Sequence, residues 1–449
     1  MHWRRTSRLR RYLNDSFWAI PAIAMLVGGL LAFIDLSFVE NHISLPQPWR
    51  YSADAADTVL AAVVSAMVGL TGIVVAVAVL IIQLATGTLS PRYMRIWYRD
   101  PQQKAVFAGF LGTLAFAYFL LRNIRGDHVP DLGVSLAGIA VLVSMLVFLR
   151  YIDRFAHLLR PVALAAYLAD VGAKVTAMYW QRLEKEGLSP LPVEAEWAAD
   201  ADEADLTVRA DRGGVVQAID PPGMLELAGR HDAILVLRCA IGDYLPAGDV
   251  LLDVYGRGEL PTEDTVRRMF LIGTERDYQQ DPAFALRIIV DIAIRALSPA
   301  VNDPTTGVQC LDYIEGLLLQ IGERELPQRY EVRDPEGTGR VVVTSRTWDD
   351  YLTLAVVEIL EYGSTSTQVT RRLRAMLGDL LRSVHTANRP AVRAQIDRLD
   401  AALAEDVPEG ARREFASRAD RQGLGGSARS NGHGPAVASV PRPWGGTHQ

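Results

Sequence analysis

The sequence is poor in the residue types that build disulfide frameworks and metal sites. Its two cysteines, Cys239 and Cys310, stand in apolar runs, with no CxxC pair and no Cys/His cluster nearby. This spacing argues against a disulfide framework or a zinc site. We expect both cysteines to be small core residues. The eight histidines are scattered along the chain, so no metal is predicted.

Catalytic motifs are missing as well. The sequence has no Gly-rich nucleotide-binding loop with its lysine, no G-x-S-x-G elbow and no H-E-x-x-H helix. It therefore predicts no catalytic residues, no cofactor and no enzyme. The net charge of −6 argues against a general nucleic-acid-binding protein.

Apolar residues are abundant. The chain is 49% hydrophobic and 22% charged, with a mean hydropathy of +0.11. It is apolar for a soluble protein and too charged for one that lies wholly in a membrane, so we expect a membrane part and a soluble part. After a basic segment at 1–16, residues 17–155 are predicted to form an α-helical membrane domain. Four apolar runs in it are long enough to span a bilayer: 17–34, 58–82, 105–121 and 132–152.

The distribution of cations predicts the orientation of these spans. Arginine and lysine gather between the second and third runs and at the end of the fourth, whereas the segment between the first and second runs has only Arg50. By the positive-inside rule, both termini lie in the cytoplasm. Residues 90–99, SPRYMRIWYR, predict a short helix at the membrane interface.

The second run is rich in small residues, which let membrane helices approach closely. The preferred interpretation is a packing face within the four-helix unit. The alternative is close packing around an oligomer axis, where the helix could line a pore. No charge lies in the middle of a span, so the relays typical of ion-coupled transporters are missing. The face comprises Ala62, Ser65, Ala66, Gly69 and Gly72.

The rest of the chain predicts a cytoplasmic α+β domain. A helix and an acidic linker (156–205) precede a small β-barrel-like module (206–260). The order of its motifs resembles that of the small barrel-sandwich modules that include lipoyl domains, but Asp220-Pro221-Pro222-Gly223 stands where their carrier lysine would be. A mainly helical part (261–405) follows, with a hairpin near 330–344. The polar tail at 406–449 is predicted to be disordered.

A helix pair over residues 281–318 carries the most informative pattern. The first helix is apolar on all sides, which predicts burial, yet Arg287, Asp291 and Arg295 recur every four residues on one face. Ser298-Pro299 ends this helix. Asp303 is predicted to cap the second helix, with Pro304 in its first position.

Charges on a buried helix are costly unless they are paired. The preferred interpretation is a closed network that includes Asn302-Asp303, in which Arg295 pairs with Asp303, and Arg287 pairs with Asp281 or Asp291. One alternative is a small anionic ligand near Arg295, Thr305 and Thr306. The other is catalysis by the carboxylates.

Three segments carry a family resemblance: Gln83–Arg92, Gly242-Asp243 with Gly248, and Gln280–Thr305. On these segments the chain, over residues 15–405, resembles the bacterial predicted membrane proteins of the domain-of-unknown-function 2254 family. The resemblance implies four spans in a bacterial inner membrane and a cytoplasmic domain, and it supplies no activity. Relatives often carry paired histidines where this chain has Leu149-Arg150-Tyr151, so no metal role is predicted there.

Three functions remain open. The first is an oligomeric channel- or permease-like protein gated by its cytoplasmic domain. The second is a membrane-anchored sensing or binding scaffold without transport, and the third is a membrane-bound enzyme. Four spans leave little room for a pore within one chain, so the first function requires a homo-oligomer in the lipid bilayer.

Overall fold

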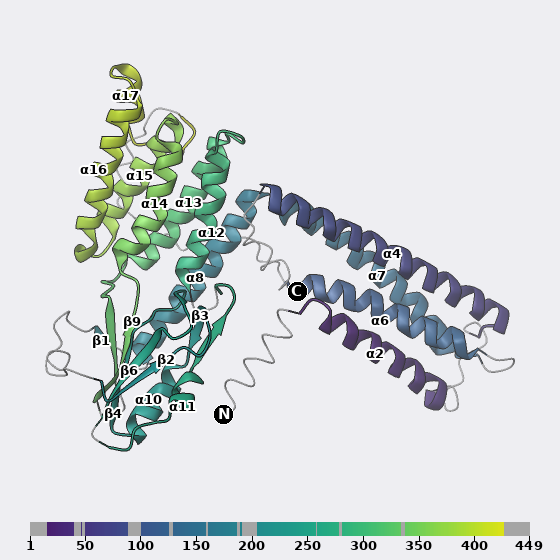
Figure 1. Cartoon of the computed structure of the whole chain (residues 1–449). Coiled ribbons are helices and arrows are strands. Elements are labelled where there is room, and N and C mark those ends of the chain that lie inside the picture. The colour runs from purple at the N-terminus through teal and green to yellow at the C-terminus, as the bar shows by residue number, and fades with distance from the viewer. Residues whose placement is uncertain are drawn as a thin grey trace. The chain divides into compact units, whose positions relative to one another are not determined.

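The chain folds into two compact units, residues 1–164 and 165–449 (Figure 1). The computed structural model describes residues 16–39, 46, 50–88, 100–124, 129–158, 160–185, 189–190, 204–256, 258–277, 281–333 and 337–425. The predicted interfacial helix at 90–99 and most of the acidic linker lie outside the described residues.

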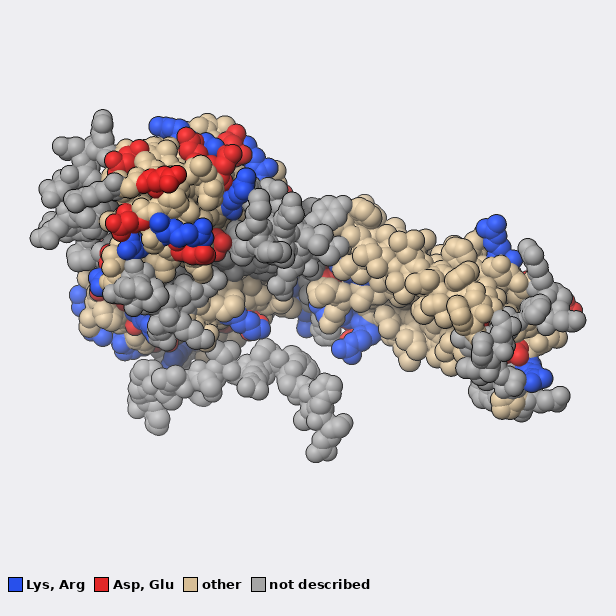
Figure 2. Space-filling model, turned by 90° about the horizontal axis from the view of Figure 1, so that it is seen from below, with Lys and Arg blue, Asp and Glu red and all other residues tan. Residues whose placement is uncertain are grey.

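Four long helices build the first unit, as predicted. Each has the length and composition of a membrane span, over Ala19–Phe38, Ala53–Leu80, Pro101–Asn123 and Asp131–Arg154. Figure 2 shows that charged side chains gather at the ends of this unit and leave its flank almost free of charge. The helices are α2 (Ala19–Ile34), which continues as the π-helical turn η1 (Asp35–Val39), α4 (Ala53–Thr88), α6 (Pro101–Asn123) and α7 (Asp131–Leu158).

Glycines allow α2 and α6 to pack closely. A Cβ atom on Gly28 would collide with the backbone carbonyl of Gly112, and one on Gly112 would lie 3.2 Å from the carbonyl oxygen of Ala24. Such close approach of backbones is how membrane helices gain packing energy. At the start of α6, Asp100 caps the helix and lies 3.0 Å from Arg154 of α7, which ties the two helices together.

The strands of the second unit form two sheets. One has six strands in the order β1-β8-β9-β4-β6-β2, and the other has three in the order β5-β3-β7. Helices α10 (Pro221–Arg230) and α11 (Glu263–Arg267) lie between strands in sequence. The strands are β1 (Ser189–Pro190), β2 (Leu206–Arg209), β3 (Gly214–Ile219), β4 (Ala233–Leu237), β5 (Tyr244–Leu245), β6 (Val250–Gly256), β7 (Phe270–Gly273), β8 (Arg329–Arg333) and β9 (Gly339–Thr344).

The larger sheet joins two segments that were predicted to lie in separate parts of the chain, the β module and the hairpin. β8 and β9 form the predicted hairpin, and β9 pairs in parallel with β4, with Leu235 opposite Val341 and Val236 opposite Val342. The β module and the hairpin therefore share one sheet. Alternating patterns predict strands but not their distant partners, which is why this pairing was not foreseen.

A helical bundle packs beside the sheets (Figure 1). α12 packs against α13 and α14, and α15 packs against α13 and α16. Gly172 of α8 faces Ala285 of α12 and Leu317 of α13. The helices are α8 (Pro161–Lys185), α12 (Pro282–Leu297), α13 (Pro304–Ile321), α14 (Trp348–Gly363), α15 (Thr367–Ser383), the 3-10 turn η3 (Thr386–Asn388), α16 (Arg389–Asp406) and α17 (Ala411–Ala416).

The prediction of a disordered tail from residue 406 is wrong for residues 407–425. This carboxy-terminal segment includes α17 and lies against α13 and α15. Arg371 of α15 is 1% exposed, lies 4.1 Å from the ring centre of Phe415 and donates to the carbonyl of Arg418 at 3.0 Å. Composition missed the segment because polar contacts, rather than an apolar face, hold it. Residues 426–449 lie outside the described residues.

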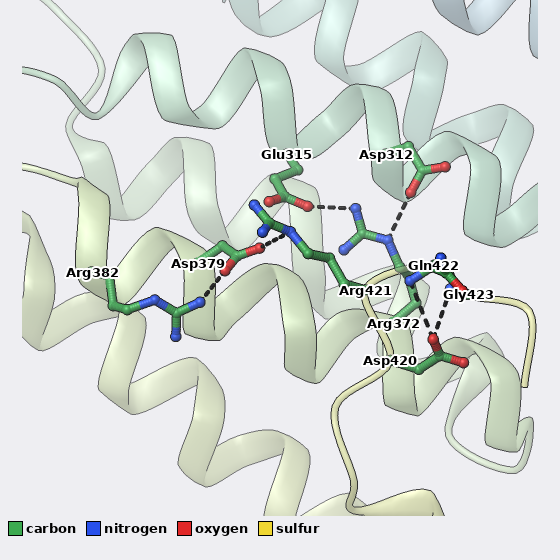
Figure 3. A network of polar contacts seen from close by, with 9 residues as sticks. All are labelled: Asp312, Glu315, Arg372, Asp379, Arg382, Asp420, Arg421, Gln422 and Gly423. Carbon is green, nitrogen blue, oxygen red and sulfur yellow. Dashed lines mark hydrogen bonds and ion pairs between the residues drawn. The ribbon is translucent and has the colours of Figure 1, made fainter. Parts of the chain in front are cut away.

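Figure 3 shows a network of arginines and carboxylates on α13, on α15 and in the carboxy-terminal segment. Arg372 of α15 donates to Asp312 of α13 at 2.7 Å and pairs with Glu315 of the same helix. Asp379 of α15 pairs with Arg421 at 3.0 Å. Asp420 accepts the backbone N–H groups of Gln422 and Gly423 at 3.2 Å and of Gly425 at 2.8 Å.

Candidate functional site

Two members of the charge ladder of α12, Arg287 and Asp291, form ion pairs inside the bundle. The Nη2 atom of Arg287 lies 2.6 Å from Oδ1 of Asp291, one turn further along the helix. The same guanidinium donates to both carboxylate oxygens of Glu358 on α14, with the Nη2–Oε2 bond at 2.8 Å. The hydrogen bond to Glu358 raises the pKa of Arg287 above its ordinary value. Two carboxylates thus hold this arginine, and an anionic ligand would have to displace one of them.

Of the two partners predicted for Arg287, the structure selects Asp291. Glu358, which is 71 residues away from Arg287 in sequence, was not predicted as a partner. The only sequence feature that could have pointed to Glu358 is its place as a carboxylate in an otherwise apolar stretch of α14. Nothing in the sequence indicates that this helix packs against α12.

The turn between α12 and α13 forms as predicted. Oδ1 of Asp303 accepts the backbone N–H of Thr306 at 3.1 Å, and Oδ2 accepts its hydroxyl at 2.6 Å. Asn302 has a φ of +49°, a left-handed conformation that asparagine tolerates well. Thr305 is exposed. The chain's own carboxylate already occupies donors of this helix start, which weighs against an anionic ligand there.

Asp281 begins α12 in the same Asp-Pro context but has different surroundings. Its Oδ1 atom accepts the backbone N–H of Phe284 at 3.2 Å. Its Oδ2 atom is buried, with no hydrogen-bond partner among the described residues, and the whole residue is only 3% exposed. Burial raises the pKa of Asp281 to about 6, although the positive charges of Arg346 and Arg276 act against the shift. A carboxylate oxygen in this state requires a hydrogen-bond donor.

Asp281 lines a cavity of about 80 Å³ within the second unit. The smaller sheet contributes Ile219, the larger sheet contributes Val343 and Thr344, and the end of α13 contributes Ile321. The segment after β9 adds Ser345 and Arg346, and the first turn of α14 adds Tyr351. The cavity therefore combines aliphatic walls with a few polar groups.

The Gly242-Asp243 motif approaches the same carboxylate. Gly242 has a φ of +93°, and a Cβ atom there would lie 2.6 Å from Oδ2 of Asp281, so glycine is required both for the turn and for the approach. Its carbonyl accepts from Nε of Arg276 at 2.8 Å. Oδ1 of Asp243 lies 3.9 Å from Nη2 of Arg346. The fold thus brings the Gly242-Asp243 motif close to Asp281. It also places Arg276 and Arg346 there, which were not predicted as site residues.

The small-residue face of α4 points away from the four-helix unit. Ala62, Ser65, Ala66, Gly69 and Gly72 are all exposed, and a Cβ atom on either glycine would meet nothing within 4 Å. The opposite side of the helix, with Leu60 and Met67, is fully buried. The preferred interpretation of an inner packing face is therefore wrong. Small residues permit close packing, but they do not identify the partner.

Metal and thiol chemistry find little support in the described part of the chain. It contains no group of three or more His, Cys, Asp or Glu side chains placed to hold a metal ion. Cys239 and Cys310 are free and buried, and burial raises the pKa of each thiol to about 12. Both cysteines are therefore poor nucleophiles.

Comparison with known proteins gives a consistent result. The sequence model of a family described as predicted membrane protein (DUF2254) matches residues 14–379. Uncharacterized proteins of Mycobacterium bovis and Mycobacterium tuberculosis are each 30% identical over 437 residues, which is 93% of this chain and 81% of theirs. No solved structure matches the chain.

Proposed function

Because this chain belongs to the DUF2254 family of predicted membrane proteins, we propose that it is an oligomeric channel- or permease-like protein regulated by its carboxy-terminal unit. The observation that carries the proposal is the exposed small-residue face of α4. Glycine, alanine and serine are enriched where membrane helices contact one another, since they allow backbones to approach. In the four-helix unit these residues have no such contact, so a helix of a second copy is the natural partner.

The pore itself would form between chains. Four spans offer little room for a path through one chain, whereas copies of α4 placed around a common axis would surround one. The side chains on this face are small and uncharged, and Ser65 is the polar one among them. Such a lining suits permeation without an acidic relay.

We further propose that the protein lies in a bacterial inner membrane with both termini in the cytoplasm. The support is the concentration of Arg and Lys between the second and third spans and after the fourth. Reporter fusions after residues 45, 99 and 127 would test it. Cytoplasmic signals at 45 and 127 would reverse the orientation.

A second function, sensing without transport, is supported by the cavity at Asp281. Among the described residues, Oδ2 of Asp281 is buried without a hydrogen-bond partner, in a cavity with aliphatic and polar walls. We take this as support for a binding site. In this case the spans would anchor a receptor domain.

The first experiment is the mass of the full chain purified in nanodiscs. A ring of several subunits supports the channel, and a monomer overturns it in favour of sensing. Flux through the purified protein in liposomes then separates a conducting oligomer from a silent one.

Cysteine crosslinking locates the contact. Gly69→Cys is expected to crosslink between chains, whereas Leu142→Cys, at a 66% exposed position on α7, serves as a matched control. The native cysteines are buried with raised pKa values, so they add little background. Equal crosslinking at both positions would contradict the proposal that α4 forms the contact between chains.

A further inference from the structure

Two buried polar atoms at the cavity have no hydrogen-bond partner among the described residues. They are the acceptor Oδ2 of Asp281 and the donor Nε of Arg346. Both residues line the cavity. Nη2 of Arg346 lies 3.9 Å from Oδ1 of Asp243. This ion pair is beyond hydrogen-bond distance and does not involve Nε. Buried polar atoms are rarely left without partners in folded proteins.

These two atoms require hydrogen-bond partners of opposite kinds. Oδ2 of Asp281 needs a donor, whereas Nε of Arg346 needs an acceptor. A simple anion would be repelled by the Asp281 carboxylate, and a simple cation would be repelled by the guanidinium groups of Arg346 and Arg276. One molecule that carries both charges would satisfy both atoms and leave the net charge of the cavity unchanged.

The remaining walls restrict the body of such a molecule. Ile219, Ile241, Ile321, Leu326 and Val343 surround the polar pair with aliphatic surface. The volume of about 80 Å³ is about half that of a roughly 150 Å³ cavity that holds benzene. The enclosed part of the ligand is therefore small and aliphatic.

We propose that this cavity binds a small aliphatic α-amino acid, with its ammonium group on Asp281 and its carboxylate on Arg346. The charged groups of the ligand lie at the start of α12 and at the segment after β9, and its side chain lies among the aliphatic residues. This inference goes beyond the proposed channel and does not depend on it, because binding belongs to the chain whether or not it conducts.

The test is calorimetric binding to the full chain in nanodiscs, with thermal unfolding as a second readout. L-alanine, L-valine and L-leucine are the probes. At saturation at least one is expected to raise the unfolding midpoint by about 2 °C or more. Isobutylamine and isovalerate, which are valine without its carboxylate and without its ammonium group, are each expected to bind about tenfold more weakly or worse.

Two variants assign the contacts. Asp281→Asn keeps the cap on α12, since asparagine caps helices as well as aspartate, but it removes the charge. Arg346→Gln removes the charge of a partly exposed side chain. Each is expected to weaken amino-acid binding about tenfold or more. Asp303→Asn is the matched control, because it changes the equivalent cap of α13 outside the cavity and should bind like the wild type.

Three results would overturn the proposal. The first is that none of the three amino acids binds, which would leave the cavity to water. The second is that isobutylamine or isovalerate binds as tightly as valine. The third is that binding survives unchanged in both Asp281→Asn and Arg346→Gln. Particle mass and flux are measured separately, so failure here is distinguishable from failure of the channel.

Discussion

Arg287 of α12 and Glu358 of α14 face each other through a two-point ion pair, in which both terminal nitrogens of the guanidinium donate to the carboxylate. Asp291 contacts the same arginine from its own helix at 2.6 Å. The charge that seemed out of place on a buried helix therefore fixes the position of α12 against α14.

The two carboxylates should differ in how much they stabilise the chain. The Asp291 side chain is 11% exposed and that of Glu358 is 41% exposed. We expect Asp291→Asn to cost about 2–4 kcal/mol, because it leaves a buried charge poorly compensated. Glu358→Gln should cost about 1 kcal/mol, since water reaches that partner. Thermal unfolding of the purified full chain checks the order, and a larger loss for Glu358→Gln would contradict the assignment.

Asp281 should make stability depend on pH between about 4 and 6. Its pKa rises from an ordinary 3.8 to about 6 in the folded chain, so the folded state holds a proton that the unfolded state has lost. The free energy of unfolding therefore falls as pH rises through this window, by roughly 3 kcal/mol for two pKa units. Asp281→Asn lacks this titration. The free energy of unfolding of Asp281→Asn, relative to that of the wild type, should therefore rise by roughly 3 kcal/mol between pH 4 and pH 7. Unfolding measured at a series of pH values without added ligand checks this.

The control for this series is Asp303→Asn, the other Asp-Pro helix cap. It leaves Asp281 in place and should therefore keep the wild-type dependence on pH. Parallel curves for wild type and Asp281→Asn would show that the group responsible lies elsewhere.

The carboxy-terminal segment should depend on Asp420. This residue is 5% exposed, accepts three backbone N–H groups and lies 3.7 Å from the buried Arg371. We expect Asp420→Ala to cost about 2–4 kcal/mol, because it removes these bonds and leaves the arginine with less compensation. Faster proteolysis near residue 410 should accompany the loss. Glu414→Ala, which removes an exposed pair with Arg418, should change stability by less than about 0.5 kcal/mol.

Glycines on α2 and α4 should respond in opposite ways. A Cβ atom on Gly28 meets the backbone of Gly112, whereas one on Gly69 meets nothing within 4 Å. Gly28→Ala is therefore expected to destabilise the four-helix unit by about 1–3 kcal/mol. Gly69→Ala should leave that unit intact within about 1 kcal/mol, since alanine favours the helix. Thermal unfolding and particle mass measured together would test this, and equal losses would contradict the outward direction of the α4 face.

Local features of the fold could be predicted from the sequence. The four spans follow from apolar runs of sufficient length, and the cap at Asp303 with Pro304 follows from turn chemistry. The burial of α12 follows from its apolar residues on every side. Each of these depends on residues within a few helical turns of one another.

Features that depend on distant partners could not be predicted. Glu358 reaches Arg287 only because α14 packs on α12, and Arg346 reaches the Asp281 cavity only because β9 joins the larger sheet. The carboxy-terminal segment looked disordered because its composition lacks an apolar face. The segment is instead held by Arg371 and Asp379 of α15, which lie too far from it in sequence for a local pattern to show the contacts.

The parallel pairing of β4 with β9 has a consequence for biogenesis. Helices α12 and α13 lie between these strands in sequence, so β4 stays an open edge until the chain through Thr344 has been synthesised. Closing so long a loop is slow, and an unpaired strand edge invites association with other chains. The second unit should thus complete its folding late, while the helices before residue 155 are already being inserted. A chaperone that shields β4 during this interval would raise the yield of native protein.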